Sequence, residues 1–298
     1  MTFEQLTIFV AVAEREHLTR AASALGLTPS AVSASIKTLE SFYNVRLFER
    51  VGRGIELTRD GQTFLKEAKE TLARVRAAEL VLGDLGNLKR GHIDIHASQT
   101  IANYWLPQRL LRFRDVYPEI ELSLTVGNTM TVTRAVVEGT AELGFIEGTI
   151  DEPAIAAQTI ALDQLVVVVP SGCKLAPAGK LPVVDTIREL AWIMREPGSG
   201  TRSEFEAALQ AFCIDVSELK VLLTLPSNEA VLKGILSSGA AAALSRAVVE
   251  PFIGNGTVTV LDIPLPSRKF TILKHKERRL SSAARRLSEL FRNSSFGT

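Results

Sequence analysis

Small polar residues gather in three turns in the second half of the chain, and each turn directly follows an expected strand. They are Ser98, Gln99, Thr100, Thr149, Ser199 and Thr201. Ligands bind at the carboxyl ends of strands in open α/β sheets, and free N–H groups at helix starts attract anions. Gly198 and Gly200 would permit close backbone approach. We therefore expect these residues to bind a small anionic effector, with helix capping as the alternative role of each single hydroxyl.

Residue types suited to catalysis or metal binding are scarce. The chain has two cysteines, four histidines and no Gly-x-Ser-x-Gly, His-Glu-x-x-His or phosphate-loop motif. His92 and His96 lie near an expected strand, where lone histidines are usually structural or exposed. We therefore predict no enzyme activity, no cofactor and no metal site. Because the sequence shows neither a secretory signal nor an apolar run of about 20 residues, a cytoplasmic protein without membrane contact is expected.

The first 58 residues have the pattern of a DNA-reading winged helix. Apolar residues at helical spacing predict short helices. Between two of them, Gly26 suits a helix end, Thr28 suits a cap and Pro29 suits a first turn. Two alternating runs around a glycine-rich turn at 51–54 then predict a β-hairpin. In a helix–turn–helix of this kind, the second helix enters the major groove of DNA.

Six residues of this segment are predicted to contact DNA. They are Thr28, Ser30, Ser33, Lys37, Arg50 and Arg53. Because arginine, asparagine and glutamine are missing from the polar side of the second helix, shape readout should outweigh direct base contacts. Arg53 at the hairpin tip suits a narrow minor groove. Arg50 has two open roles, a phosphate contact or an internal ion pair with Glu40 or Glu49.

A long helix is expected over residues 59–89, with Thr58 as its cap. Its apolar residues recur every 3.5 positions on average, which is the coiled-coil period. This stripe consists of Phe64, Ala68, Leu72, Val75, Ala78, Leu82 and Leu85. A single exposed helix with such a stripe needs a partner, so we favour dimerisation through it over packing on its own domain.

From residue 90 onward, strands alternate with helices, which predicts a mostly parallel sheet and two α/β lobes. We expect lobe I at about 90–161 plus 268–298 and lobe II at about 162–267. Residues 268–298 carry nine basic and two acidic side chains, although the whole chain has a net charge of only +1. We interpret this basic end as the solvated face of a last helix, with a nucleic-acid-binding tail as the alternative.

A long run of specified positions extends through the helix–turn–helix and the hairpin. It consists of Leu18-Thr19-Arg20-Ala21-Ala22-x-x-Leu25-x-Leu27-Thr28-Pro29-Ser30-Ala31-Val32-Ser33-x-x-Ile36-x-x-Leu39-Glu40, Leu47-Phe48-x-Arg50 and Leu57-Thr58-x-x-Gly61. This run resembles the N-terminal signature of the LysR-type transcriptional regulators. The resemblance implies a winged helix–turn–helix at 1–58, a dimerisation helix at 59–89 and a two-lobed α/β effector domain at 90–298, like type 2 periplasmic binding proteins. It also implies promoter DNA, RNA polymerase and further copies of the chain, as homodimer or homotetramer, as partners.

Two positions depart from the pattern of that family. Thr28-Pro29-Ser30 stands where many members have Ser-Gln-Pro, so the glutamine that often contacts a base has no counterpart. Ala34 stands where many members have a long polar residue. Operator preference is therefore less defined than the fold, although Ser33, Lys37 and Arg53 match family positions that commonly meet DNA.

The effector half resembles the branch of the family that is linked to sulfur assimilation and carbon fixation. The resemblance rests on Ser98-Gln99-Thr100-Ile101-Ala102-Asn103-Tyr104 and Arg195-Glu196-x-Gly198-Ser199-Gly200-Thr201-Arg202. It implies sulfite, sulfate, or a small phosphorylated or carboxylated metabolite as effector. Glu147 suits an anion site only if it pairs with Arg202 or points outward.

The expected function is effector-controlled transcriptional regulation. An α/β enzyme and a solute-binding protein are the alternatives, which the missing catalytic motifs and the first 58 residues argue against.

Overall fold

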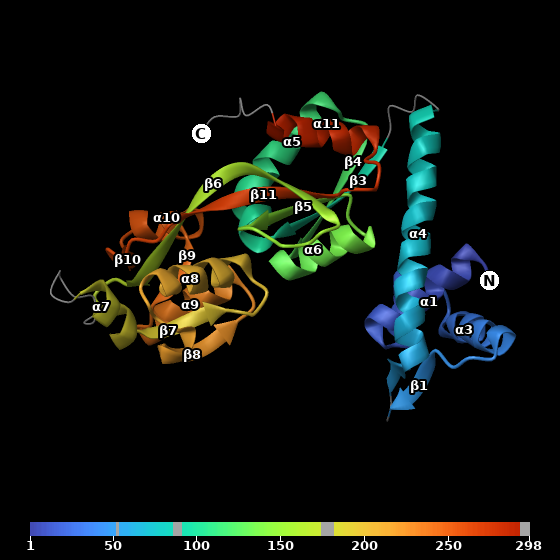
Figure 1. The fold of residues 1–298 in the computed structure, drawn as a ribbon, viewed down its shortest axis with the longest axis horizontal. Helices are drawn as coiled ribbons and strands as arrows, with labels where there is room; N and C mark the ends of the chain where they lie inside the picture. Colours follow the sequence, from blue (N-terminus) through green and yellow to red (C-terminus); the bar gives the residue numbers. More distant parts are fainter. Residues whose placement is uncertain (52–53, 86–90, 174–181, 293–298) are drawn as a thin grey trace. The chain divides into compact units, whose positions relative to one another are not determined.

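The computed structural model describes residues 1–51, 54–85, 91–173 and 182–292. The chain divides into two compact units, Met1–Gly86 and Asn87–Thr298. The N-terminal unit is a winged helix followed by one long helix (Figure 1). Its elements are α1 (Phe3–Arg15), α2 (Leu18–Leu25), α3 (Pro29–Tyr43), β1 (Phe48–Val51), β2 (Gly54–Leu57) and α4 (Arg59–Leu85). Strands β1 and β2 pair antiparallel, with Phe48 opposite Leu57.

The turn between α2 and α3 forms as its residue types predict. Gly26 follows α2 with a φ of +67°, in the left-handed region that glycine favours. Thr28 caps α3, because its Oγ1 accepts a hydrogen bond from the Ala31 backbone N–H at 3.2 Å. Pro29 occupies the first turn of α3. The predicted helix–turn–helix is therefore confirmed.

The apolar stripe of α4 is divided along its length. Phe64, Ala68 and Leu72 pack on the core of their own unit, which contains Phe9 of α1. Leu82, in the last turn of the helix, is 68% exposed. The first half of the stripe therefore packs within the chain, which corrects the expectation that the whole stripe meets a second copy. The expected last part of this helix, residues 86–89, lies outside the described residues.

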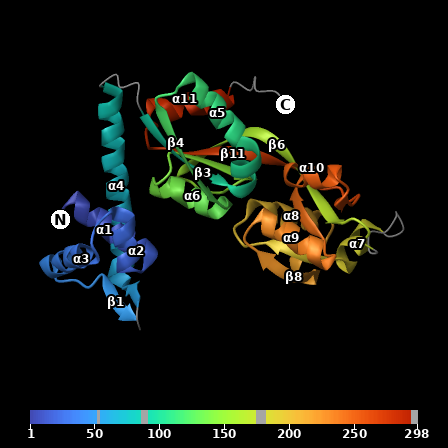
Figure 2. The same cartoon turned by 180° about the vertical axis from the view of Figure 1, so that it is seen from behind.

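The second unit consists of two α/β lobes (Figure 2). Lobe I contains β3 (Gly91–Ser98), the π-helical turn η1 (Ile101–Trp105), α5 (Leu106–Val116), β4 (Ile120–Gly127), α6 (Thr129–Glu138), β5 (Leu143–Glu147) and α11 (Ser282–Arg292). Lobe II contains α7 (Val183–Glu189), β7 (Ala191–Arg195), α8 (Gly200–Ala211), the 3-10 turn η2 (Val216–Glu218), β8 (Lys220–Leu225), α9 (Asn228–Ser238), β9 (Ala242–Ser245), α10 (Arg246–Gly254) and β10 (Val258–Val260). Two further strands, β6 (Ile155–Pro170) and β11 (Ser267–His275), pair with each other where the lobes join.

The sheets are mixed, which corrects the expectation of a mostly parallel sheet. The larger sheet has the order β10-β6-β11-β5-β3-β4, and β9 also pairs with β6. Strand β3 pairs parallel with β4 and β5, whereas every pairing of β6 and β11 is antiparallel. In lobe II, β7 and β8 pair parallel. The reason is that the chain leaves lobe I along β6 and returns to it along β11, so these strands run in opposite directions.

Each lobe has its own hydrophobic core. Lobe I packs α5 and α11 on one side of its sheet and α6 on the other (Figure 1), around Ile95 and Phe145. Lobe II packs around Trp192 and Phe205. The predicted strand at 165–169 is buried along its whole length. Among the described helices, none has the length and hydropathy to cross a membrane.

Candidate functional sites

The polar residues predicted on α3 lie on the surface of the N-terminal unit. Ser30 and Lys37 are exposed, and Ser33 is half-buried. Thr28 is exposed too, but its Oγ1 is engaged by the Ala31 N–H and by the Ser30 hydroxyl at 3.0 Å. Within the described part of the chain, the side chains of Ser33 and Lys37 have no hydrogen bond. These two side chains therefore remain available to another molecule.

The contacts of Glu40 bear on the role of Arg50. Oε1 of Glu40 accepts hydrogen bonds from the backbone N–H groups of Leu47 at 2.7 Å and Phe48 at 3.1 Å. Glu40 therefore joins the end of α3 to the start of the hairpin. Arg50 is exposed and makes no ion pair with Glu40 or any other described residue, which favours the phosphate-contacting role. Arg53 lies outside the described residues.

Four of the six residues predicted to bind an effector are buried, at the carboxyl end of β3 and the start of α8. Ser98, Thr100, Ser199 and Thr201 are each 1–2% exposed. Gln99 is half-buried, whereas Thr149, after β5, is exposed. The structure therefore places the four hydroxyls where lobe I and lobe II face each other and leaves Thr149 accessible to solvent.

Asn228, at the start of α9, connects the two lobes. Its Nδ2 donates to Thr100 Oγ1 at 3.1 Å, and its backbone N–H donates to Gln99 Oε1 at 2.6 Å. Arg195 Nη1 donates to Asn228 Oδ1, and Asn228 is fully buried. Thr100 and Gln99 therefore contact the opposite lobe itself. Asn228 could not be singled out from the sequence, because one asparagine at a helix start belongs to no motif.

Gly198 and Gly200 allow a close approach, but to the other lobe. The Met130 N–H donates to the Gly198 carbonyl oxygen at 3.2 Å. A Cβ on Gly200 would lie 2.7 Å from the Glu147 carbonyl oxygen, which is too close for any side chain. The glycines therefore let the start of α8 press against the ends of β5 and the start of α6.

Arg268, at the start of β11, is a buried cation that the sequence analysis did not single out. Its side chain is 0% exposed; Nε donates to Asp163 Oδ2 at 2.7 Å, and Nη1 donates to Thr201 Oγ1 at 2.9 Å. Arg268 Nη2 and Ser98 Oγ are the buried side-chain nitrogen and oxygen atoms without a hydrogen-bond partner in the described ranges. A buried polar atom without a partner costs about 1–3 kcal/mol.

A signal for Arg268 is present in the sequence. Arg268, Phe270 and Ile272 alternate along β11, and all three side chains are buried. An arginine at an inward-facing strand position is rarely fully buried unless it has partners. Arg268 has such partners in Asp163 and Thr201, and an arginine in the alternating pattern of an expected strand is the signal that could have drawn attention to it.

Besides Asp163, the carboxyl group of Glu204 lies near Arg268, and Glu147 lies near Glu204. The Glu147 side chain is buried. Arg202 pairs with Glu206 at 2.7 Å, so the suggested pairing of Arg202 with Glu147 is wrong. Burial raises the pKa of the Glu204 carboxyl above its ordinary value, and the positive charge of Arg268 opposes this shift. The site therefore combines the buried cation Arg268 with nearby carboxyl groups, of which Glu204 has a raised pKa.

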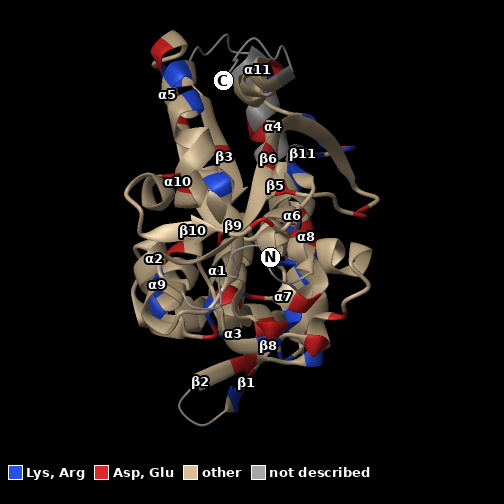
Figure 3. Cartoon of the chain, turned by 90° about the vertical axis from the view of Figure 1, so that its left-hand side faces the viewer, with Lys and Arg blue, Asp and Glu red and all other residues tan. Residues whose placement is uncertain are grey.

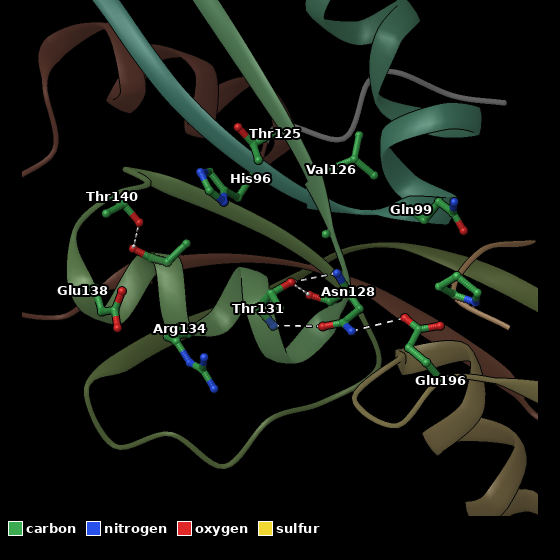
Figure 4. A pocket seen from close by; sticks show the side chains of 13 residues that line it. His96, Gln99, Thr125, Val126, Asn128, Thr131, Arg134, Glu138, Thr140 and Glu196 are labelled. Atoms are coloured by element: carbon green, nitrogen blue, oxygen red, sulfur yellow. Dashed lines mark hydrogen bonds between the residues drawn. The ribbon is translucent and has the colours of Figure 1, made fainter. Parts of the chain in front are cut away.

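A cavity of about 540 Å³ lies at the carboxyl end of β4 (Figure 4). Its lining is His96, Gln99, Thr125, Val126, Gly127, Asn128, Thr131, Arg134, Ala135, Glu138, Thr140, Glu196 and Pro226. Of the residues predicted to bind an effector, Gln99 is in this lining. Asn128 Nδ2 donates to Glu196 Oε1 at 3.2 Å, from lobe I to lobe II.

Burial lowers the pKa of His96, with Asp94 opposing, so this imidazole is neutral at neutral pH. Among the described residues, no group of three or more His, Cys, Asp or Glu side chains is placed to hold a metal ion.

Two family models together match nearly the whole chain. The model described as bacterial regulatory helix-turn-helix protein, lysR family, matches residues 3–62, and the LysR substrate binding domain matches residues 86–295. The HTH-type transcriptional regulator YeiE of Escherichia coli (strain K12) is 32% identical over 291 residues, covering 96% of this chain and 95% of YeiE.

Solved structures share this architecture. Full-length CbnR, solved with its target DNA, has a TM-score of 0.69 at 21% identity and covers 99% of this chain and 100% of its own. The regulatory domain of Synechocystis PCC6803 CcmR, solved with 2-PG, has a TM-score of 0.62 at 26% identity. That match covers 70% of this chain and 99% of the CcmR chain. The comparisons confirm the predicted fold, a winged helix–turn–helix joined to a two-lobed α/β domain.

Proposed function

The chain belongs to the LysR family of bacterial helix–turn–helix transcriptional regulators, and we propose that a small anion bound between its lobes controls its activity on DNA. DNA is read by α3, through Ser30, Ser33 and Lys37, and by the hairpin, through Arg50 and Arg53. Thr28 contributes by fixing the start of α3. The short side chains of α3 offer few bidentate contacts to bases, so the shape of the operator contributes much of the specificity.

Arg268 carries the anion proposal. Its guanidinium is held between Asp163 and Thr201, which aims the remaining nitrogen, Nη2, in a fixed direction. A guanidinium binds oxyanions through parallel N–H donors, and burial strengthens such contacts. Ser98 Oγ is a second buried group that lacks a partner among the described residues. Thr100, Ser199 and Gln99 are further members of the predicted set, and the exposed Thr149 is its remaining member. The CcmR regulatory domain solved with 2-PG supports a small-molecule effector.

The anion changes the balance between two arrangements of the lobes. Asn228 binds Gln99 and Thr100 directly, so an anion that takes over these polar groups replaces contacts between lobes with contacts to ligand. Such a population shift requires only that the anion binds one arrangement more tightly. No bond is made or broken, so we assign no enzyme activity. This regulator would act in the cytoplasm, with promoter DNA and RNA polymerase as partners.

Exposed apolar side chains support self-association. Val221, Leu222 and Leu223 of β8 are 39%, 44% and 54% exposed, although three adjacent apolar residues on an edge strand are unfavourable in water. Leu82 of α4 is a further exposed apolar residue. Two separate apolar surfaces are consistent with either a homodimer or a homotetramer.

The first test of this function is native mass spectrometry of the full chain on a DNA fragment from its own upstream region. We expect an even number of chains on one fragment. Titration with sulfite, sulfate and 2-PG should add one anion per chain for at least one of these probes. Monomers without DNA affinity would contradict both the DNA-reading and the self-association proposals.

Substitutions at the anion site then test the residues. Thr201→Val keeps the shape of the side chain but removes the hydroxyl that orients Arg268, and we expect at least tenfold weaker anion binding. Arg268→Lys keeps a cation for Asp163 but loses the parallel N–H donors of the guanidinium, and we expect a similar loss of anion affinity. Thr224→Val, at an exposed position of β8, is the matched control and should bind normally. Unchanged affinity in both site variants would place the anion elsewhere.

A further inference from the structure

A second polar cavity lies in lobe I, where β11 ends and α11 begins, and it has a volume of about 260 Å³. It is lined by Lys274, His275, Lys276, Arg278, Arg279, Leu280, Arg285, Ser288 and Glu289. Five of these residues are lysine or arginine and one is acidic. Figure 3 draws lysine and arginine in blue, and blue segments are visible beside the label of β11. Part of the basic C-terminal segment therefore lines a cavity, in addition to forming the solvated face of the last helix.

Three of the five basic side chains are not neutralised by contacts within the described chain. None of Lys274, Arg279 and Arg285 makes an ion pair with a described residue, and Lys274 is half-buried. Like charges that share a partly buried cavity repel each other, and the repulsion grows as water is excluded. A bound anion would remove this repulsion. The charge of the cavity therefore favours a ligand of opposite sign.

Hydrogen bonds to the backbone give the cavity fixed walls. Arg278 Nη1 donates to the Val136 carbonyl oxygen at 2.9 Å, and Lys276 Nζ donates to the Pro153 carbonyl oxygen at 2.6 Å. These contacts hold the segment after β11 against α6 and the loop before β6. On α11, Ser288 is 7% exposed and adds a neutral hydroxyl. A site with walls held in place loses less entropy on binding than a set of mobile surface lysines.

We propose that this cavity binds a compact polyanion with at least two adjacent phosphate groups, at a site separate from the one between the lobes. The volume is below the range of about 300–1,000 Å³ that is usual for drug-sized ligands, which favours a small ligand. The excess of cations over carboxylates suits a multiply charged group better than a single sulfate. None of the lining residues belongs to the inter-lobe site, so the proposal does not rest on the function proposed above.

Isothermal titration of the full chain with inorganic tripolyphosphate tests this site, with inorganic phosphate as the weaker probe. We expect one tripolyphosphate per chain at this site. The double variant Lys274→Gln/Arg279→Gln should bind at least tenfold more weakly. The control Arg114→Gln/Lys220→Gln changes the net charge equally at exposed positions elsewhere and should keep its affinity. If the double variant does not fold, as judged by circular dichroism, Arg279→Gln alone serves, with a loss of at least threefold expected.

Three results would overturn the proposal. The first is that tripolyphosphate does not bind, and the second is that the control variant loses as much affinity for tripolyphosphate as the double variant. The third is that Arg268→Lys loses affinity for tripolyphosphate while Lys274→Gln/Arg279→Gln keeps it. The last result would place the ligand between the lobes. An independent readout is His275, whose pKa is lowered by burial and by Arg278, with Glu277 and Glu152 opposing. Nuclear magnetic resonance should show this pKa rising when tripolyphosphate binds, and no change would count against the site.

Discussion

At the scale of single residues, Glu204 links the anion site to pH. Burial raises the pKa of its carboxyl above the ordinary 4.5, Arg268 and Lys269 oppose the shift, and Glu147 adds to it. Because the folded pKa exceeds the unfolded one, the free energy of unfolding falls as pH rises from about 4.5 through the folded value, and then levels off. Glu204→Gln should flatten this region of the profile, as measured by urea unfolding across that pH range.

The same substitution bears on anion affinity. Ionised Glu204 places a negative charge near Arg268, so Glu204→Gln should bind the anion about fivefold more tightly at neutral pH, on the order of 1 kcal/mol. Glu206→Gln, two residues further along α8, is the control and should leave anion affinity unchanged. Titration calorimetry measures both variants. Equal affinities of Glu204→Gln and the unaltered chain would contradict this role.

Glu40 is a second residue with a defined effect, this time on stability. Its carboxylate accepts two backbone hydrogen bonds, from Leu47 and Phe48, at the point where α3 passes into the hairpin. Hydrogen bonds to charged groups contribute about 1.5–3 kcal/mol, so Glu40→Ala should lower the free energy of unfolding of the N-terminal unit by that order. Urea unfolding measures the loss. Glu49→Ala, an exposed position on β1, should have little effect, and equal losses would argue against the cap-like role of Glu40.

At the scale of elements, the two halves of α4 should respond differently to substitution. Leu72 packs on the core of its own unit, so Leu72→Ala should reduce stability by about 1–2 kcal/mol. Leu82 is largely exposed, so Leu82→Asn should leave the fold intact and weaken self-association instead. Thermal unfolding and sedimentation velocity separate these effects. An unchanged oligomeric state of Leu82→Asn would show that self-association relies on other surfaces, such as β8.

The same scale shows which features the sequence could predict. The turn of Gly26, Thr28 and Pro29 was predictable because each residue acts on backbone only a few positions away. The antiparallel pairing of β11 with β6 was not, because it joins Arg268 to Asp163, and no local pattern specifies such a distant partner. The hydroxyls of the candidate site follow strands and could be found. Arg268 and Asn228 reach that site only through tertiary packing.

At the scale of the whole molecule, a polar contact that does not involve Arg268 joins the two lobes. Burial and the neighbouring Glu229 raise the pKa of Tyr104 to about 12, so the phenol stays protonated and donates to Glu229 Oε1 at 3.0 Å. Tyr104 belongs to lobe I and Glu229 to lobe II. Tyr104→Phe keeps the ring but removes this donor, at a cost of about 1 kcal/mol to the closed arrangement.

Hydrogen–deuterium exchange of the full chain measures this effect. Amides of residues 98–104 and 226–230 should exchange about fivefold faster in Tyr104→Phe, because opening of the lobes becomes more frequent. Tyr43→Phe, at an exposed position in the other unit, should exchange normally in both segments. Unchanged exchange in Tyr104→Phe would mean that other contacts between the lobes, such as those of Asn228 and Asn128, are enough to hold the lobes closed.

The position of β11 in the sheet has a consequence for protein synthesis. Strand β11 lies between β6 and β5, yet it follows every other described strand in the sequence, so the ribosome releases it after them. Domains generally fold in order of their emergence, so the winged helix can fold while the sheet of the second unit still lacks an inner strand. A nonsense codon shortly before Ser267 would therefore yield a truncated product that still occupies operators but ignores the effector. Such an allele should behave as dominant negative beside the intact gene.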